Sequence, residues 1–128
     1  MATVEITADT FEKTIAENDI VLVDFWADWC GPCKMFAPVF DKSSTEHDDV
    51  VHAKLDTDAN QELAGALGIQ GIPTLMAFRE GVLVFNQAGA LPAKSLEEVV
   101  TAVKGLDMTE VHQKVAEMRA EEGETAAN

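Results

Sequence analysis

The sequence has few cysteines, few basic residues and no long apolar run, and each shortage excludes a class of protein. Only 2 of its 128 residues are cysteine, which rules out a framework of several disulfide bonds. Lys and Arg number 9 against 23 Asp and Glu, so the formal net charge is −14. A surface this acidic repels nucleic-acid phosphates and anionic lipid headgroups, so we expect neither nucleic acid nor a membrane as a partner.

Targeting signals are also missing from the sequence. No stretch approaches the roughly 20 apolar residues that a bilayer-spanning helix needs. The first six residues include Glu5 and lack the basic run and apolar core of a secretory signal. We therefore expect a cytoplasmic protein, in a compartment where thiols are kept reduced. Cysteines in such a protein are more often catalytic or metal-binding than structural.

What is present fits one globular domain, with 47% hydrophobic and 25% charged residues. Apolar, β-branched runs predict strands at 4–6, 20–27, 50–55, 74–78 and 82–85. Helical patterns are expected over 10–17, from about residue 33, over 60–67, and from a capping box at Ser95 and Glu98 to Gly105. Strands and helices alternate in the first part of the chain, and a β-hairpin follows late. This order favours an α/β fold with a partly parallel sheet that has an antiparallel edge.

The C-terminal segment divides into two parts. Met108, Val111, Val115 and Met118 recur at three- and four-residue spacing, which predicts an amphipathic helix over 107–120. Residues 121–128 are acidic and small, so we expect a disordered tail. Two interpretations of the apolar stripe stay open: packing on its own domain, which we prefer, or contact with a partner or a second copy.

The chemistry of the chain lies at Cys30-Gly31-Pro32-Cys33. A cysteine at a helix start is the better nucleophile of such a pair, because the helix N-terminus stabilises its thiolate. Cys33 follows inside the first turn, where we expect it to be the more buried. The arrangement suits thiol–disulfide exchange, in which Cys30 attacks a substrate disulfide and Cys33 resolves the mixed disulfide.

A zinc site is the competing interpretation of the cysteines. Cys30, Cys33, His47 and His52 fit a Cys-x2-Cys-x13-His-x4-His pattern. His52 falls on a predicted strand rather than a helix face, and a charge of −14 is foreign to a nucleic-acid-binding finger. We therefore predict no metal and interpret these two histidines and His112 as surface residues.

Two further features have open alternatives. Asp24 interrupts an apolar strand, and it is either a buried carboxyl with a raised pKa, with Lys54 as a candidate neighbour, or a hydrated group at a strand end. Pro73 follows Ile72 just before another apolar strand, and that peptide bond is either cis or, as in most cases, trans.

The stretch from Asp24 to Lys34 resembles the active-site signature of the thioredoxin family. The similarity continues in the family's order and spacing at 37–38, 54–56, 68–69, 71–75 and 89–91. The resemblance implies the thioredoxin fold, a central five-stranded mixed sheet flanked by four helices. Residues 1–106 would form this domain and 107–128 a C-terminal extension.

The resemblance also implies roles for individual residues. Cys30 would attack and Cys33 resolve, Asp24 would be the buried acid and base beneath Cys33, and Lys54 would tune it. Pro73 would be cis and lie against the dithiol. The implied substrate-binding residues are Trp29, Gly31, Pro32, Ile72, Pro73, Gly89 and Ala90.

The family's activity would make this chain a general protein-disulfide reductase that maintains cell redox homeostasis without a bound cofactor. NADPH would serve indirectly through thioredoxin reductase, the other partners would be disulfide-containing client proteins, and the chain would be a monomer. Two alternatives are a scaffold module with an incidental cysteine pair, and a dedicated reductant whose extra helix selects one client.

Three residues depart from the family pattern. Ser43 and Ser44 lie where the family's long second helix is usually apolar, so we expect that helix to fray or bend early. His52 occupies a strand position that is usually apolar.

Overall fold

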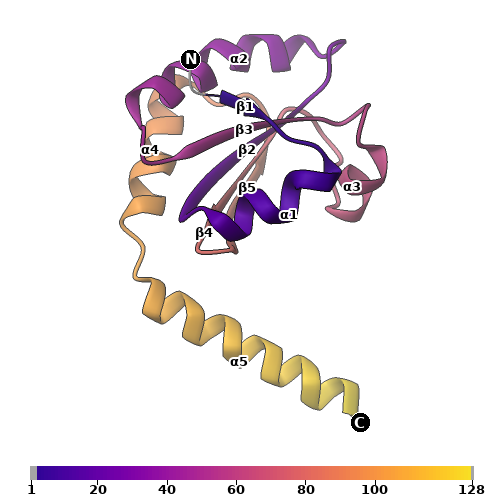
Figure 1. Cartoon of the computed structure of the whole chain (residues 1–128), viewed down its shortest axis with the longest axis vertical. Helices are drawn as coiled ribbons and strands as arrows, with labels where there is room; N and C mark the ends of the chain where they lie inside the picture. The colour runs from indigo at the N-terminus through magenta and orange to yellow at the C-terminus, as the bar shows by residue number, and fades with distance from the viewer. Residues whose placement is uncertain (1–2, 128) are drawn as a thin grey trace.

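Five strands form one mixed sheet in the order β1-β3-β2-β4-β5 in the computed structural model, which describes residues 3–127 (Figure 1). The strands are β1 (Thr3–Glu5), β2 (Ile20–Trp26), β3 (Val51–Asp56), β4 (Thr74–Arg79) and β5 (Val82–Ala88). The helices are α1 (Ala8–Glu17), α2 (Gly31–Glu46), α3 (Gln61–Ala66), α4 (Ala93–Lys104) and α5 (Met108–Ala127). β3 pairs in parallel with β1 and β2, whereas β4 and β5 are antiparallel, which confirms the predicted fold class.

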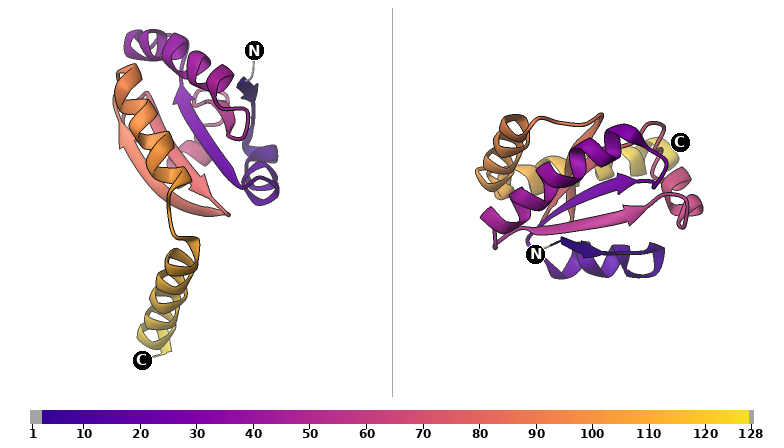
Figure 2. Two further views of the ribbon diagram at one scale, coloured as in Figure 1. Left: turned by 90° about the vertical axis from the view of Figure 1, so that its left-hand side faces the viewer. Right: turned by 90° about the horizontal axis from the view of Figure 1, so that it is seen from above.

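Helices cover both faces of the sheet, with α1 and α3 on one side and α2 and α4 on the other (Figure 2). β2 lies at the centre and alternates between the two cores. Val21, Val23 and Phe25 pack in the α1 side, and Ile20 and Leu22 in the α2 side. Because side chains on a strand alternate with period two, Asp24 lies on the same face as Leu22, beneath the α2 layer.

The start of α4 differs from the predicted capping box. The helix begins at Ala93, and Pro92 is its N-cap, so Ser95 already lies inside the first turn. The Leu96 N–H donates to the Pro92 carbonyl at 3.0 Å. Proline is tolerated there because it has no N–H to leave unpaired, and Ala93 and Lys94 are good helix formers. Gly105 caps the other end, as predicted.

α5 is longer than predicted and runs from Met108 to Ala127. The segment 121–127, expected to be disordered, is helical, which corrects that expectation; residue 128 lies outside the described residues. Ala and Glu have high helix propensity, so an acidic, small-residue composition does not by itself break a helix that is already nucleated. Within residues 3–127, no helix combines the length and apolarity needed to cross a membrane.

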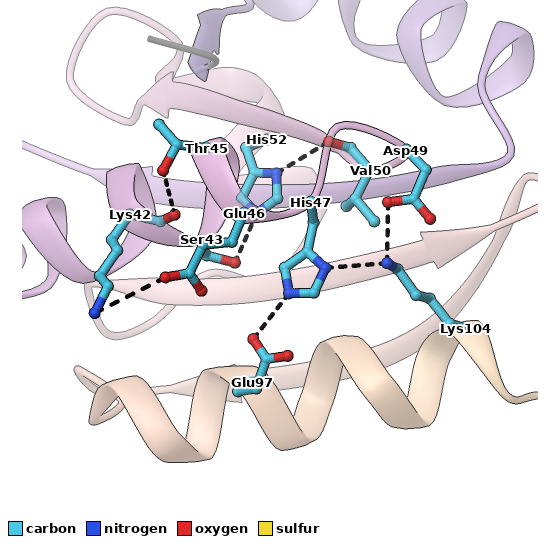
Figure 3. Close-up of polar contacts among 10 residues, drawn as sticks. All are labelled: Lys42, Ser43, Thr45, Glu46, His47, Asp49, Val50, His52, Glu97 and Lys104. Atoms are coloured by element: carbon cyan, nitrogen blue, oxygen red, sulfur yellow. Dashed lines mark hydrogen bonds and ion pairs between the residues drawn. The ribbon is translucent and has the colours of Figure 1, made fainter.

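α2 does not fray at its serines, and His52 is not a surface residue. The helix continues to Glu46, Ser43 and Ser44 are buried, and His52 is fully buried on β3. His52 Nδ1 donates to the Val50 carbonyl at 3.0 Å, so its Nε2 accepts the Ser43 hydroxyl at 2.9 Å (Figure 3). Two of the three residues that depart from the family pattern, Ser43 and His52, are therefore hydrogen-bonded to each other.

Replacing Ser43 with alanine should destabilise the fold by about 1–3 kcal/mol, because a buried histidine nitrogen loses its partner. Thr45→Ala is the matched control, since Thr45 is exposed on the same helix and its hydroxyl bonds a local carbonyl. That variant should stay within about 0.5 kcal/mol of the parent. Urea unfolding at pH 7 measures both, and equal midpoints for the two variants would contradict the buried pairing.

The buried His52 also makes the stability of the fold depend on pH. Burial lowers the pKa of His52 from its ordinary value of 6.5, so the unfolded chain binds a proton more readily than the native one. Its contribution to stability is complete above pH 6.5 and is lost as the pH falls below that value.

Candidate active site

Cys30 and Cys33 lie where β2 gives way to α2. Cys30 is the N-cap of the helix, and its sulfur accepts the backbone N–H of Cys33 at 3.1 Å. The two residues form a disulfide, with their Cα atoms 5.2 Å apart. Pro32 stands in the first turn, where its missing N–H costs nothing. In the reduced protein, the same N–H and the positive end of the helix favour a thiolate at Cys30.

Both cysteines are buried to the same degree, with 3% of Cys30 and 4% of Cys33 exposed. The expectation that Cys33 is the more buried is therefore wrong for the disulfide form. Ala27 is buried with the pair, and Trp26 and Ile72 pack against it. A small apolar cluster of this kind limits attack on the disulfide to thiols that dock against the surface beside it.

The loop before β4 brings the second group of predicted residues to the disulfide. The Ile72–Pro73 peptide bond is cis, as the family resemblance implies. Cys30 Sγ lies 3.6 Å from the Ile72 carbonyl oxygen. The Gly89 N–H donates to the Pro73 carbonyl at 2.7 Å, and Gly89 has φ of 106°, a conformation that favours glycine. Residues far apart in sequence thus surround the cysteine pair.

The predicted substrate-binding residues differ in exposure. Gly31, Pro32, Gly89 and Ala90 are exposed, Ile72 is half-buried and Pro73 is buried. Trp29 is 70% exposed, although its indole N–H donates to Asp58 Oδ2 at 2.9 Å. An exposed tryptophan held by one hydrogen bond offers a fixed apolar face beside Cys30.

Sequence reasoning did not single out Asp58. It follows β3, which is parallel to β2, and the carboxyl ends of parallel strands meet at one edge of a sheet. The rule therefore places the polar residues that follow β3 beside the loop that follows β2. It is the sequence signal from which the contact between Asp58 and Trp29 can be predicted.

Asp24 is buried within β2, so the interpretation as a hydrated strand end is wrong. None of its surface is exposed, and neither carboxyl oxygen has a hydrogen-bond partner. Burial raises the pKa of Asp24 from 3.8 to about 7, and this outweighs the opposing effect of the Lys54 charge. The negative charge of Asp41, on α2, makes a smaller contribution to the same rise, and sequence reasoning missed that residue.

Lys54 is the neighbour that the sequence predicted for Asp24. The two residues are directly opposite each other in the β2–β3 pairing. Lys54 Nζ lies 5.2 Å from the centre of the Trp26 ring. A cavity of about 140 Å³ is lined by Cys33, Trp26 and Lys54, among others, so it joins the resolving cysteine to the lysine. Solvent can therefore approach Cys33 from the side of Lys54.

The four residues of the zinc pattern do not form one site. The cysteines are joined to each other, and both ring nitrogens of His52 are hydrogen-bonded inside the protein. His47 is half-buried, and its Nδ1 lies 3.0 Å from the Lys104 ammonium, which can only donate. His47 Nε2 therefore carries its proton and donates to Glu97 at 2.8 Å, linking α2 to α4 (Figure 3).

Among the described residues, one group has the residue types and spacing of metal ligands. Glu46, His47 and Glu97 have ligand atoms within 4.8 Å of one another. A metal at His47 Nε2 requires the ring proton on Nδ1, where it would face the Lys104 ammonium. The hydrogen-bond polarity therefore opposes metal binding at this cluster.

A cysteine pair at a helix start, packed against a cis-proline loop, defines a thiol–disulfide oxidoreductase. The thioredoxin family model matches residues 2–102. The chain belongs to the thioredoxin family, and it is a protein-disulfide oxidoreductase.

Individual relatives agree with this assignment. The chain is 51% identical over 122 residues to "Putative thioredoxin 2" of Streptomyces coelicolor, a match that covers 95% of this chain and 91% of that protein. It is 44% identical over 101 residues to the thioredoxin of Bacillus subtilis, covering 78% of this chain and 96% of that protein. A mutant thioredoxin from Halobacterium salinarum is similar in structure, with a TM-score of 0.75 and 37% identity over 81% of this chain and 92% of that chain.

Proposed function

We propose that this protein is a general reductase of protein disulfides. The observation that carries the proposal is the Cys33 N–H directed at the Cys30 sulfur, because it stabilises a thiolate on the cysteine next to exposed Trp29. The Cys30 thiolate attacks a client disulfide, forms a mixed disulfide and releases the first client thiolate. Cys33 then attacks the sulfur of Cys30 and breaks its bond to the client. The client is released with both thiols reduced, and the Cys30–Cys33 disulfide forms.

Asp24 serves as the acid and base of the second step. Cys33 must lose its proton before it attacks, and a carboxyl with a pKa of about 7 can accept and return a proton near neutral pH. Lys54 acts through Asp24, because its positive charge keeps that pKa from rising further. The face position of Asp24 beneath α2 and the cavity between Cys33 and Lys54 support this assignment.

Client proteins bind across the surface around the disulfide. The carbonyl oxygen of Ile72 lies beside Cys30, and the peptide bond that follows it, to Pro73, is cis. Trp29, Pro32 and Ala90 are exposed and apolar, so a client segment near its disulfide can cover them. Gly31 and Gly89 have open space where a side chain would be, which lets a client backbone come close.

The oxidised pair must be reduced again for turnover. We propose thioredoxin reductase as the electron donor, with NADPH as its source of electrons, in the cytoplasm, and with no cofactor bound to this chain. Residues 1–106 form the catalytic domain in this proposal, and residues 107–128 form an extension built on α5.

A reductase-coupled assay tests the proposal. With NADPH, a bacterial thioredoxin reductase and insulin, NADPH oxidation should depend on this protein and continue until the insulin is reduced. Without insulin, consumption should stop after about one equivalent of NADPH, because one dithiol takes one electron pair. Insulin reduction with dithiothreitol as the electron donor is the control, because it measures the disulfide reduction by this protein without thioredoxin reductase. No acceleration in that control would contradict a reductase function, and acceleration without NADPH use would contradict the reductase partner alone.

A further inference from the structure

Two large apolar side chains stay exposed on either side of the cysteine pair in the chain. Met35 is 74% exposed and Trp29 is 70% exposed, the two highest values among the large apolar residues that the structure describes. Exposed apolar residues that are scattered singly are ordinary, but two that flank a reacting disulfide call for an explanation. Trp29 already belongs to the proposed client surface, whereas the proposed function gives Met35 no role.

Helix geometry brings the Met35 side chain towards the disulfide. Met35 follows Pro32 by three residues and Gly31 by four, and all three are exposed on α2. The Cα–Cβ bonds of a helix tilt towards its N-terminus, so a long side chain covers the turn that precedes its own Cα. That turn begins at Cys30, and the space beside Gly31 is open. Met35 can therefore reach over the start of the helix towards the cysteine pair.

Met35 lies on the flank of α2 that faces α4. Val39, four residues further along the helix, lines a cavity between α2 and α4 together with Ala93. Residues four apart share one face of a helix, so Met35 lies on this flank one turn nearer to the disulfide. Lys34 lines the cavity that also borders the resolving cysteine, and it therefore lies on the other flank. The first charged residue on the flank of Met35 is Lys42, two turns further along.

The chain that leads into α4 extends this uncharged surface. Residues 81–93 contain no charged residue, although 25% of the whole chain is charged. Ala90 and Pro92 are exposed within this segment. The hydrogen bond from the Gly89 N–H to the Pro73 carbonyl holds the segment beside the cis-proline loop. An uncharged surface therefore borders the disulfide on the side of α2 that carries Met35.

The distance along α2 determines which part of a client meets Met35. From Cys30 to Met35 the helix rises by roughly 7.5 Å. Two residues of an extended client segment span about 6.6 Å, and side chains two residues apart fall on the same face of that segment. A client segment that runs along α2 with its cysteine at the Cys30 sulfur therefore places the side chain two residues away over Met35.

We propose that Met35 is a specificity-determining residue of this oxidoreductase, and that it binds an apolar side chain two residues from the client cysteine that Cys30 attacks. Methionine suits this task, because its three rotatable bonds and polarisable sulfur let it pack against apolar side chains of different shapes. Trp29 is fixed by comparison, since it is hydrogen-bonded to Asp58. The inference rests on the proposed reductase function and adds to it a preference among clients.

Mixed disulfides of short peptides with thionitrobenzoate test the proposal. The aryl thiolate is the better leaving group because its pKa is lower, so Cys30 of the reduced protein bonds to the peptide sulfur and releases the coloured thiolate. Each peptide carries one cysteine in a serine-rich sequence, with leucine or serine two residues before or after it. At one of these two positions the second-order rate constant should be roughly tenfold higher for leucine than for serine, the lower end of what one apolar contact contributes.

Variants assign this preference to Met35. Met35→Gln keeps the length of the side chain and makes it polar, so the ratio of the leucine rate to the serine rate should fall below about twofold, whereas Met35→Leu should retain it. Met118→Gln is the matched control, because it makes the same change at another exposed methionine, on α5, and it should keep the preference of the parent. All three variants should react at the parent's rate with the thionitrobenzoate disulfide of mercaptoethanol, which has no side chain to reach Met35. Equal rates there show that each variant is folded and that its Cys30 is intact.

Three results would overturn the proposal. The first two are a parent that shows no preference for leucine at either position and a preference that survives Met35→Gln. The third is a Met35→Gln variant that keeps the preference but is regenerated more slowly by NADPH and thioredoxin reductase, which would assign the surface to the reductase. A failure of the proposed function is seen separately, as a parent that does not accelerate the reduction of insulin by dithiothreitol.

Discussion

Replacing Cys30 with serine should reduce insulin-disulfide reduction to the uncatalysed background. A serine hydroxyl is not ionised near neutral pH, so the Cys33 N–H and the helix N-terminus have no thiolate to stabilise. Cys33 does not replace the lost nucleophile, because it lies inside the first turn of α2, whereas position 30 is the N-cap and stands next to exposed Trp29. The measurement is the initial rate with dithiothreitol as the reductant. Full activity in this variant would refute attack by Cys30.

Cys33→Ser should trap client proteins as mixed disulfides, whereas Cys30→Ser should not react with them. Cys30 still attacks, but no second thiol is present to release the client, so mixed disulfides accumulate. Non-reducing electrophoresis and mass spectrometry should show covalent adducts that dithiothreitol dissolves. The double variant, with both cysteines replaced by serine, is the control and should capture nothing. Equal capture by the double variant would show that clients bind without thiol exchange, as a scaffold module would.

Asp24→Asn should stabilise the fold and slow the reaction. The folded-state pKa of Asp24 is about 7, above its ordinary 3.8, so the native state binds the proton more tightly than the unfolded chain. The stability linked to this proton is complete below pH 3.8 and is lost as the pH rises to 7. A shift of this size corresponds to a cost of about 4 kcal/mol for the ionised parent.

Asparagine removes that cost because it carries no charge. The variant should therefore be more stable than the parent at pH 8, by up to about 4 kcal/mol, and the difference should shrink towards pH 4. Urea unfolding at several pH values measures the difference. Asp48→Asn is the control, since Asp48 is exposed. A constant difference across this pH range would contradict the raised pKa.

The rate should fall for the same reason that stability rises. Without a proton acceptor for Cys33, turnover at pH 7 should drop roughly a hundredfold, which is the lower end of the usual contribution of general base catalysis. In the parent, turnover should increase with pH through about 7, where the pKa of Asp24 lies, and this increase should be missing in the variant. An unchanged pH profile would show that Asp24 has only a structural role.

Local signals predicted much of this molecule correctly. The β-branched run of β2, the cysteines at a helix start and the glycine after α4 all depend on residues close together in sequence. At His52 the prediction failed because the deciding partner is distant in sequence. His52 was expected at the surface because a lone histidine is polar, yet Ser43, on a different element, makes its burial acceptable.

The sequence by itself determined the chemistry of this protein: two cysteines two residues apart, a carboxyl in an apolar strand, and motifs in the order that the thioredoxin family uses. Only the tertiary structure decided the environment of those groups. It removed Asp24 from water and raised its pKa, brought the cis-proline loop to Cys30, and directed α5 away from its own domain. The reason is physical, because propensity and periodicity act over a few residues, whereas desolvation and packing depend on segments that folding brings together.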